Sequence, residues 1–88
     1  MKYTLTTGND WSPKVPIQAG SFNFSISGTF SATITVQRTF NNGTNWFDVE
    51  TFTVPGQYIG TEGAGCLYRV GIKSGEYVSG SADIVMVA

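Results

Sequence analysis

Apolar and polar residues alternate along most of this chain with the period of two that is typical of β-strands. In residues 31–38, apolar positions alternate with threonine and glutamine, and residues 45–54 continue the pattern after Asn41-Asn42-Gly43. Asparagine and glycine tolerate the positive φ angles of tight turns. The segment therefore predicts an antiparallel hairpin, with a β-bulge near Glu50 and Thr51, where the apolar face of the second arm switches.

The same alternation predicts further short strands and no helix, because no window carries the spacing of an amphipathic helix. These strands are expected at residues 2–6, 22–27, 68–73 and 81–87, with at most a short strand at 58–59 and a loop at 60–65. Frequent turn signals between short strands indicate an all-β fold. We expect a small antiparallel β-sandwich or barrel of six to eight short strands.

Residues 1–16 differ from the rest, because two prolines in this segment cannot occupy a central strand. We therefore expect an N-terminal arm or edge element at 1–16 and a sandwich or barrel domain at 17–88. Trp11 packs either on its own sheet or in an interface, where tryptophan is an enriched anchor. The arm supplies the expected protein-contact residues, which are Tyr3, Leu5, Trp11, Pro13 and Pro16.

The composition limits the classes of partner. The chain has 88 residues, of which 41% are hydrophobic and 12% charged, with a net charge of −1. One small domain with a thin core is suited to burying more surface against a partner. The five basic residues are scattered, so we expect no nucleic-acid binding. The longest apolar run, residues 84–88, is too short to span a bilayer and no signal peptide is visible. We expect a soluble protein made in a cytoplasm.

Few residues could perform chemistry. The chain has no histidine and a single cysteine, Cys66. Without histidine, the usual base that activates a serine or cysteine nucleophile is missing. Metal sites built from histidines or from several thiolates are also excluded, as is an intrachain disulfide. Asp48 and Glu50 lie two apart on one expected strand, so they should share a face. As a pair they could bind a calcium ion or act as acid and base, but the ordinary pattern of a half-buried sheet makes them the solvated side of that strand. Cys66 is expected to be a small residue in or near the core. We expect no catalytic, cofactor or metal site, and no enzyme.

Two resemblances add to this interpretation. The turn Thr39-x-Asn41-x-Gly43-x-Asn45-Trp46 resembles the Asp-box of sialidases and related β-propellers, a hairpin-folding motif, with Asn41 in place of the aspartate. One copy in a chain of this length implies a hairpin and no propeller.

The wider pattern, over about residues 20–88, resembles small β-rich virion proteins of tailed bacteriophages, including capsid decoration (cement) proteins. It includes residues 27–30, the hairpin, residues 68–75 and residues 79–82. The resemblance implies a homotrimer that binds the major capsid protein on the outer surface of the virion, after synthesis in the cytoplasm of a host bacterium. A neck or tail component with the same fold is an alternative. Another is a carbohydrate-binding or host-adhesion module on the virion, for which Trp11 and Trp46 could form an exposed platform.

Overall fold

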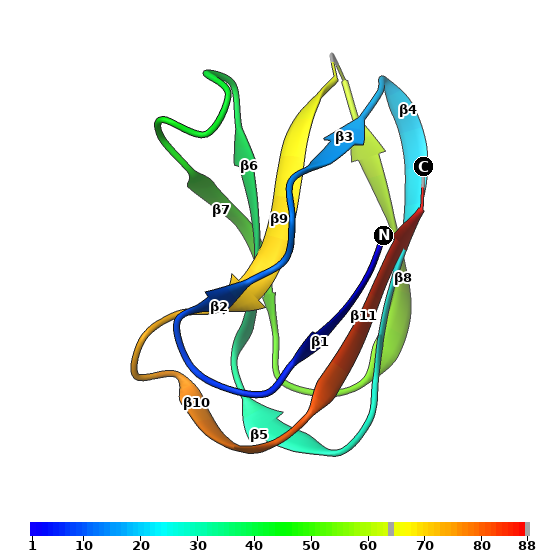
Figure 1. The fold of residues 1–88 in the computed structure, drawn as a ribbon. Coiled ribbons are helices and arrows are strands. Elements are labelled where there is room, and N and C mark those ends of the chain that lie inside the picture. Colours follow the sequence, from blue (N-terminus) through cyan, green and yellow to red (C-terminus); the bar gives the residue numbers. More distant parts are fainter. Residues whose placement is uncertain (64, 88) are drawn as a thin grey trace.

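Two antiparallel sheets packed face to face form the body of the protein, in a computed structural model that describes residues 1–63 and 65–87 (Figure 1). Sheet A contains, in order, β1 (Lys2–Leu5), β11 (Ala82–Val87), β4 (Gly20–Ser27) and β8 (Gly56–Glu62). Sheet B runs from β2 (Asp10–Trp11) and β3 (Val15–Ile17), which both pair with β9 (Cys66–Ile72), to β6 (Ile34–Thr39) and β7 (Phe47–Phe52). A small third sheet pairs β5 (Phe30–Ala32) with β10 (Tyr77–Gly80).

This architecture confirms the all-β fold and is consistent with a small β-sandwich. The described residues form eleven strands, more than the six to eight expected. Most of the additional strands are short: β2, β3 and β5 have two or three residues each. Such elements carry too few residues to show an alternating pattern. Among the described residues there is no helix long and apolar enough to cross a membrane.

The predicted hairpin is present as β6 and β7, which pair antiparallel. Its loop contains two residues in the left-handed region, Asn42 with φ 58° and Gly43 with φ 93°. Two side chains hold the loop together. The Thr39 hydroxyl accepts hydrogen bonds from the backbone N–H groups of Asn41 and Gly43 and donates one to Asn41 Oδ1. Asn41 Oδ1 also accepts from the backbone N–H of Asn45, at 2.9 Å. Short polar side chains thus replace the missing backbone pairs of the turn.

The predicted bulge lies one residue earlier than expected. The register passes from Val36↔Glu50 to Gln37↔Asp48, which leaves Val49 unpaired. A bulge changes the side to which the following residues point. Glu50 therefore lies beside the core residue Val36, whereas Asp48 lies beside Gln37 on the outer face. The expectation that Asp48 and Glu50 share a face was wrong for this reason.

Strand β8 was largely missed by the sequence analysis. It pairs with β4 over seven residue pairs without a register shift, although residues 60–65 were expected to form a loop. Its inward positions are Gly56, Tyr58, Gly60 and Glu62, which do not form an apolar row. Gly60 is required by packing, because a Cβ atom there would approach the Phe22 ring to 2.3 Å. Gly60 therefore interrupts the apolar pattern by which β8 could be recognised in the sequence, and it also allows β8 to pack against Phe22 of β4.

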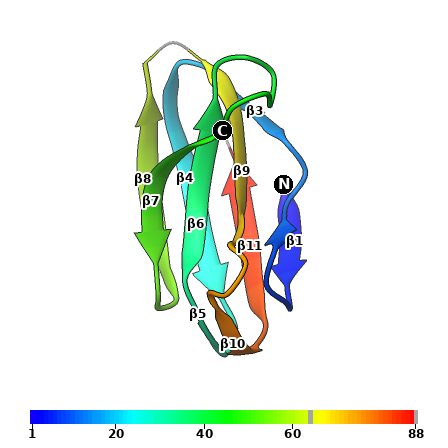
Figure 2. The same cartoon turned by 90° about the vertical axis from the view of Figure 1, so that its left-hand side faces the viewer.

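The N-terminal segment is an edge of both sheets (Figure 2). Strand β1 pairs with β11 in sheet A, and the chain then crosses to sheet B, where β2 and β3 pair with β9. Between β2 and β3, the backbone N–H of Ser12 donates to the Val70 carbonyl, and the Val70 N–H donates to Ser12 Oγ. Strands β7 and β8 form the opposite edges of the two sheets.

The core lies between the inner faces of sheets A and B. It is built from alternating positions of the long strands, as the period of two requires. Its buried apolar residues are Leu5, Ile17, Phe22, Phe24, Ile26, Ile34, Val36, Tyr68, Val70, Ile72, Ala82, Ile84 and Met86.

Candidate functional site

Two tryptophans contact one arginine on the outer face of sheet B. The guanidinium carbon of Arg69 on β9 lies 4.2 Å from the ring centroid of Trp11 and 4.3 Å from that of Trp46. Gly71 makes room for this contact, because a Cβ atom there would lie 2.5 Å from the Trp11 ring. Cation–π contacts of this kind contribute about 0.5–2 kcal/mol each. They join β2, at one edge of the sheet, to the residue that precedes β7, at the other edge.

Hydrogen bonds extend this stack across the sheet. Arg69 Nε donates to Gln37 Oε1 at 2.9 Å, and Gln37 Nε2 donates to Asp48 Oδ1 at 2.8 Å. Lys73 forms an ion pair with the other carboxylate oxygen of Asp48. The hydrogen bonds from Lys73 and Gln37 lower the pKa of Asp48, the bond to Asp48 raises the pKa of Lys73, and burial lowers the pKa of Arg69. The donors and acceptors of this row therefore bind one another across β9, β6 and β7.

The stack bears on the interpretation of the tryptophans as a glycan platform. Such a platform needs free ring faces. Trp11 and Trp46 are both half-buried, and the guanidinium of Arg69 lies over each ring. The structure thus brings together the two tryptophans that the sequence analysis paired, but around an arginine rather than as an exposed platform. The sequence analysis did not identify Arg69, although the alternation of residues 68–73 already placed this residue on the face opposite the core.

A second polar cluster surrounds a buried carboxylate at the end of β8. Glu62 is only 4% exposed, and it lies 3.4 Å from the Arg38 guanidinium. Its other oxygen accepts hydrogen bonds from the Cys66 thiol and the Tyr68 hydroxyl. Burial and the neighbouring Glu62 raise the pKa of Cys66 to about 11. The thiol is therefore protonated at neutral pH and a poor nucleophile. Its half-buried place beside the core agrees with the sequence analysis.

No group of three or more His, Cys, Asp or Glu residues within 1–63 and 65–87 is arranged to hold a metal ion. Asp48 and Glu50, the pair considered from the sequence, lie on opposite faces of β7. Asp48 is engaged by Lys73, as described above.

Exposed apolar side chains gather along the β7 and β8 edges. We define the edge patch as Phe40, Phe47, Val49, Val54 and Ile59, whose side chains are between 45% and 77% exposed. These residues all come from the segment between the end of β6 and the middle of β8. The rings of Phe40 and Phe47 contact each other with centroids 6.4 Å apart. Val49 and Ile59 line one groove, and grouped exposed apolar side chains on a small protein mark an interaction site.

A groove between β7 and β8 continues the edge patch toward the core. It has a volume of about 220 Å³ and is lined by Val49, Ile59 and aromatic residues that include Phe52 and Tyr58. The rings of Phe52 and Tyr58 lie 4.3 Å apart and connect the two edges. Glu50 also lines this groove. The groove can therefore accept an apolar side chain, with a carboxylate nearby.

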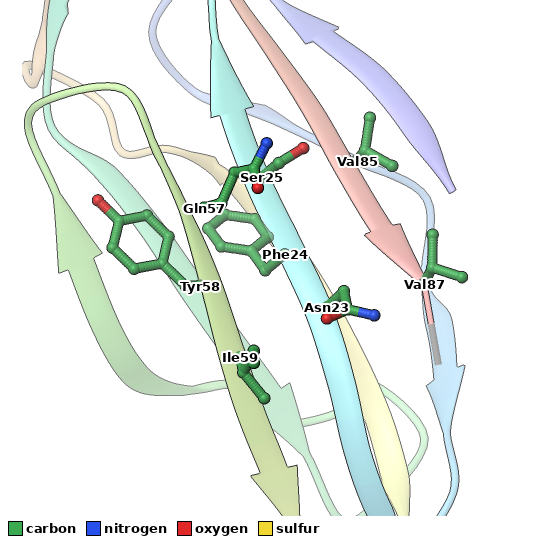
Figure 3. A pocket seen from close by; sticks show the side chains of 8 residues that line it. All are labelled: Asn23, Phe24, Ser25, Gln57, Tyr58, Ile59, Val85 and Val87. Atoms are coloured by element: carbon green, nitrogen blue, oxygen red, sulfur yellow. The ribbon is translucent and has the colours of Figure 1, made fainter.

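The outer face of sheet A carries a separate, shallow hollow of about 350 Å³ (Figure 3). Polar side chains from β4 and β8, namely Asn23, Ser25 and Gln57, alternate here with the aliphatic Ile59 and Val87. Ile59 thus borders both this hollow and the groove.

Two of the residues expected to contact a partner take part in folding contacts of this chain. Leu5 is 0% exposed and belongs to the core, so its side chain does not reach a partner. This corrects the expectation for Leu5. The half-buried Tyr3 donates a hydrogen bond of 2.6 Å to Asp10, and this bond raises the pKa of Tyr3. Both residues belong to an edge strand that pairs with β11.

The other three residues of the expected contact surface lie between β1 and the end of β3. Trp11 is part of the stack with Arg69, whereas Pro13 and Pro16 are exposed on the edge of sheet B. The sequence analysis did not single out the edge patch, because the alternation of residues 45–54, which include Phe47 and Val49, indicates a strand with one buried apolar face. The density of large apolar residues between 40 and 59 was the available signal. No family model, curated protein or solved structure matches this chain.

Proposed function

We propose that this chain is a non-catalytic structural protein of a tailed-phage virion, and specifically a decoration protein that binds the major capsid protein on the outside of the shell. The sequence pattern of residues 20–88 supports the class of protein. The observation that carries the binding role is the edge patch, since five of the seven large apolar residues exposed in the described part of the chain come from the segment between the end of β6 and the middle of β8.

Binding of this kind needs apolar surface and repetition rather than reactive groups. Each square ångström of apolar surface removed from water contributes roughly 25 cal/mol. Part of that gain offsets the loss of translational and rotational freedom on association. Phe40 and Phe47 project from a hairpin whose loop is fixed by Thr39 and Asn41, so little additional ordering is required. Many copies on a regular lattice would multiply modest individual contacts.

The location is tested by imaging labelled copies on intact particles of the phage that encodes the chain. We expect label spread over the shell. Label confined to a vertex or to the tail would assign the protein to the neck or tail instead. Particles without any label would refute a virion role of either kind.

The contact surface is tested by substituting Phe47 with aspartate. Because an aromatic anchor removed from an interface typically costs about 2 kcal/mol or more, we expect binding to purified heads in co-sedimentation to weaken by about 30-fold. Val78→Asp is the matched control, since Val78 is 74% exposed and lies on β10, outside the edge patch. Equal binding by the Phe47 variant and the control would remove the edge patch from the capsid contact.

A further inference from the structure

The free edge of β8 lacks the features by which the other sheet edges resist pairing. Edge strands present unpaired backbone groups, and charges, prolines and bulges normally protect them. Strand β1 carries Lys2, β3 carries Pro16, and β7 carries Asp48 together with a bulge. Strand β8 has seven residues in unbroken register with β4, and its one charged residue, Glu62, is buried. This edge is therefore a regular, uncharged template for another strand.

The sequence of β8 is complementary to itself. In an antiparallel pair of two β8 strands centred on Ile59, all seven residues overlap, and Ile59 lies opposite its own copy. Gln57 then lies opposite Thr61 on the outer face, and Tyr58 lies opposite Gly60 on the inner face. Aliphatic pairs, polar pairs and an aromatic residue beside a glycine are favourable cross-strand combinations. No like charges meet in this register.

Exposure and area fit the same arrangement. Ile59 is 77% exposed, the highest value among the large apolar residues, and it lies near the middle of the strand (Figure 3). The side face that contains β8 measures at most the 35 Å length of the molecule by 17 or 26 Å, or about 600–900 Å². Standard interfaces bury roughly 800 Å² per partner. The groove beside Ile59 would be covered by the second copy.

From these observations we infer that two copies of this chain pair through β8, antiparallel about a two-fold axis at Ile59, so that two A sheets become one continuous sheet. The interface is isologous, with the same strand on both sides, and it closes at two copies. It differs from the homotrimer that the sequence resemblance implies. It concerns only copies of this chain, but it covers Ile59 and the groove beside it, so the capsid contact would then use the residues of the edge patch on the hairpin, Phe40 and Phe47.

The test uses charge substitution at the two-fold axis, measured by sedimentation velocity at concentrations that span the dimerisation of the unsubstituted chain. We expect the unsubstituted chain to form a dimer. Ile59→Lys and Ile59→Glu should each be monomeric at the concentration where the unsubstituted chain is half dimeric, because like charges would meet at the axis. An equimolar mixture of the two variants should recover the dimer. Val78→Lys, an exposed site on β10, should dimerise normally.

A cysteine at the axis provides an independent measurement. Directly opposed residues of an antiparallel pair have Cα atoms about 4.5–5.5 Å apart, within the range that a disulfide bridges. Ile59→Cys should give a covalent dimer on mild oxidation, whereas Val78→Cys should dimerise without forming a covalent cross-link. The inference would be overturned by any of five results. The unsubstituted chain could be a monomer at every concentration or a trimer, or its dimer could be unaffected by Ile59→Lys. The mixture of the two charge variants could stay monomeric, or the Ile59→Cys cross-link could fail to form.

Discussion

Leu5 provides the clearest test of how the N-terminal segment contributes to stability. Its side chain is fully buried between the sheets, although it belongs to a four-residue edge strand. Truncation of a buried leucine to alanine costs about 2–5 kcal/mol, because apolar contacts are lost and a cavity remains. A chain of 88 residues at roughly 0.05–0.15 kcal/mol per residue has a total stability of about 4–13 kcal/mol. Leu5→Ala should therefore remove a large fraction of the folding free energy.

The measurement is urea unfolding followed by tryptophan fluorescence. We expect the midpoint to fall for Leu5→Ala, with an unchanged slope, and the melting temperature to fall by about 4–8 °C for each kcal/mol lost. Lys2→Ala is the matched control on the same strand, because Lys2 is exposed and surface changes usually stay within about 0.5 kcal/mol. A loss below about 1 kcal/mol for Leu5→Ala would mean that β1 is a detachable arm, contrary to the reasoning from its burial.

Three further predictions concern single side chains. Gly71→Ala should destabilise the protein by about 1–3 kcal/mol through overpacking, because the new Cβ would lie 2.5 Å from the Trp11 ring. The near-ultraviolet circular dichroism of Trp11 should change as well. An unaltered spectrum and melting temperature would contradict this prediction. Cys66 should react with iodoacetamide far more slowly than a free thiol at pH 8, and it should become reactive near pH 11, its pKa. The urea-unfolded chain is the control. Equal rates for the folded and the unfolded chain would refute the assigned environment of the thiol. The contacts with Lys73 and Gln37 lower the pKa of Asp48, so they stabilise the fold above the ordinary carboxyl pKa and lose this effect as the pH falls through the lowered value. Asp48→Asn should therefore reduce the acid sensitivity of the melting temperature slightly, since the site is exposed, whereas an unchanged pH profile would contradict the assignment.

The edges of the sheets explain why Leu5 was wrongly expected to contact a partner. Prolines and tryptophan in residues 1–16 indicated a segment outside the central sheet, and the structure does place this segment at sheet edges. An edge position does not decide whether a side chain is exposed, however. Leu5 faces the core. Phe47 and Val49 belong to an alternating segment that indicated a buried apolar face, yet their side chains are 54% and 45% exposed. Whether an apolar strand face is covered depends on how far the opposite sheet extends.

The sequence by itself determined the secondary structure class and the central hairpin. Alternation with a period of two and the positive φ angles available to Asn42 and Gly43 are local properties, so they can be recognised from neighbouring residues. The turn that joins the two arms also sets their pairing, and β6 and β7 pair antiparallel as expected.

Only the tertiary structure decided which distant strands meet. Strand β8 shows no apolar row, and it becomes a strand because β4 pairs with it along seven residues and Phe22 occupies the space above Gly60. The stack of Trp11 and Trp46 on Arg69 likewise depends on the order of strands in sheet B. Pairing between residues far apart in the chain is stabilised by burial and hydrogen bonds that form only in the folded state, so the local pattern of residues does not encode it.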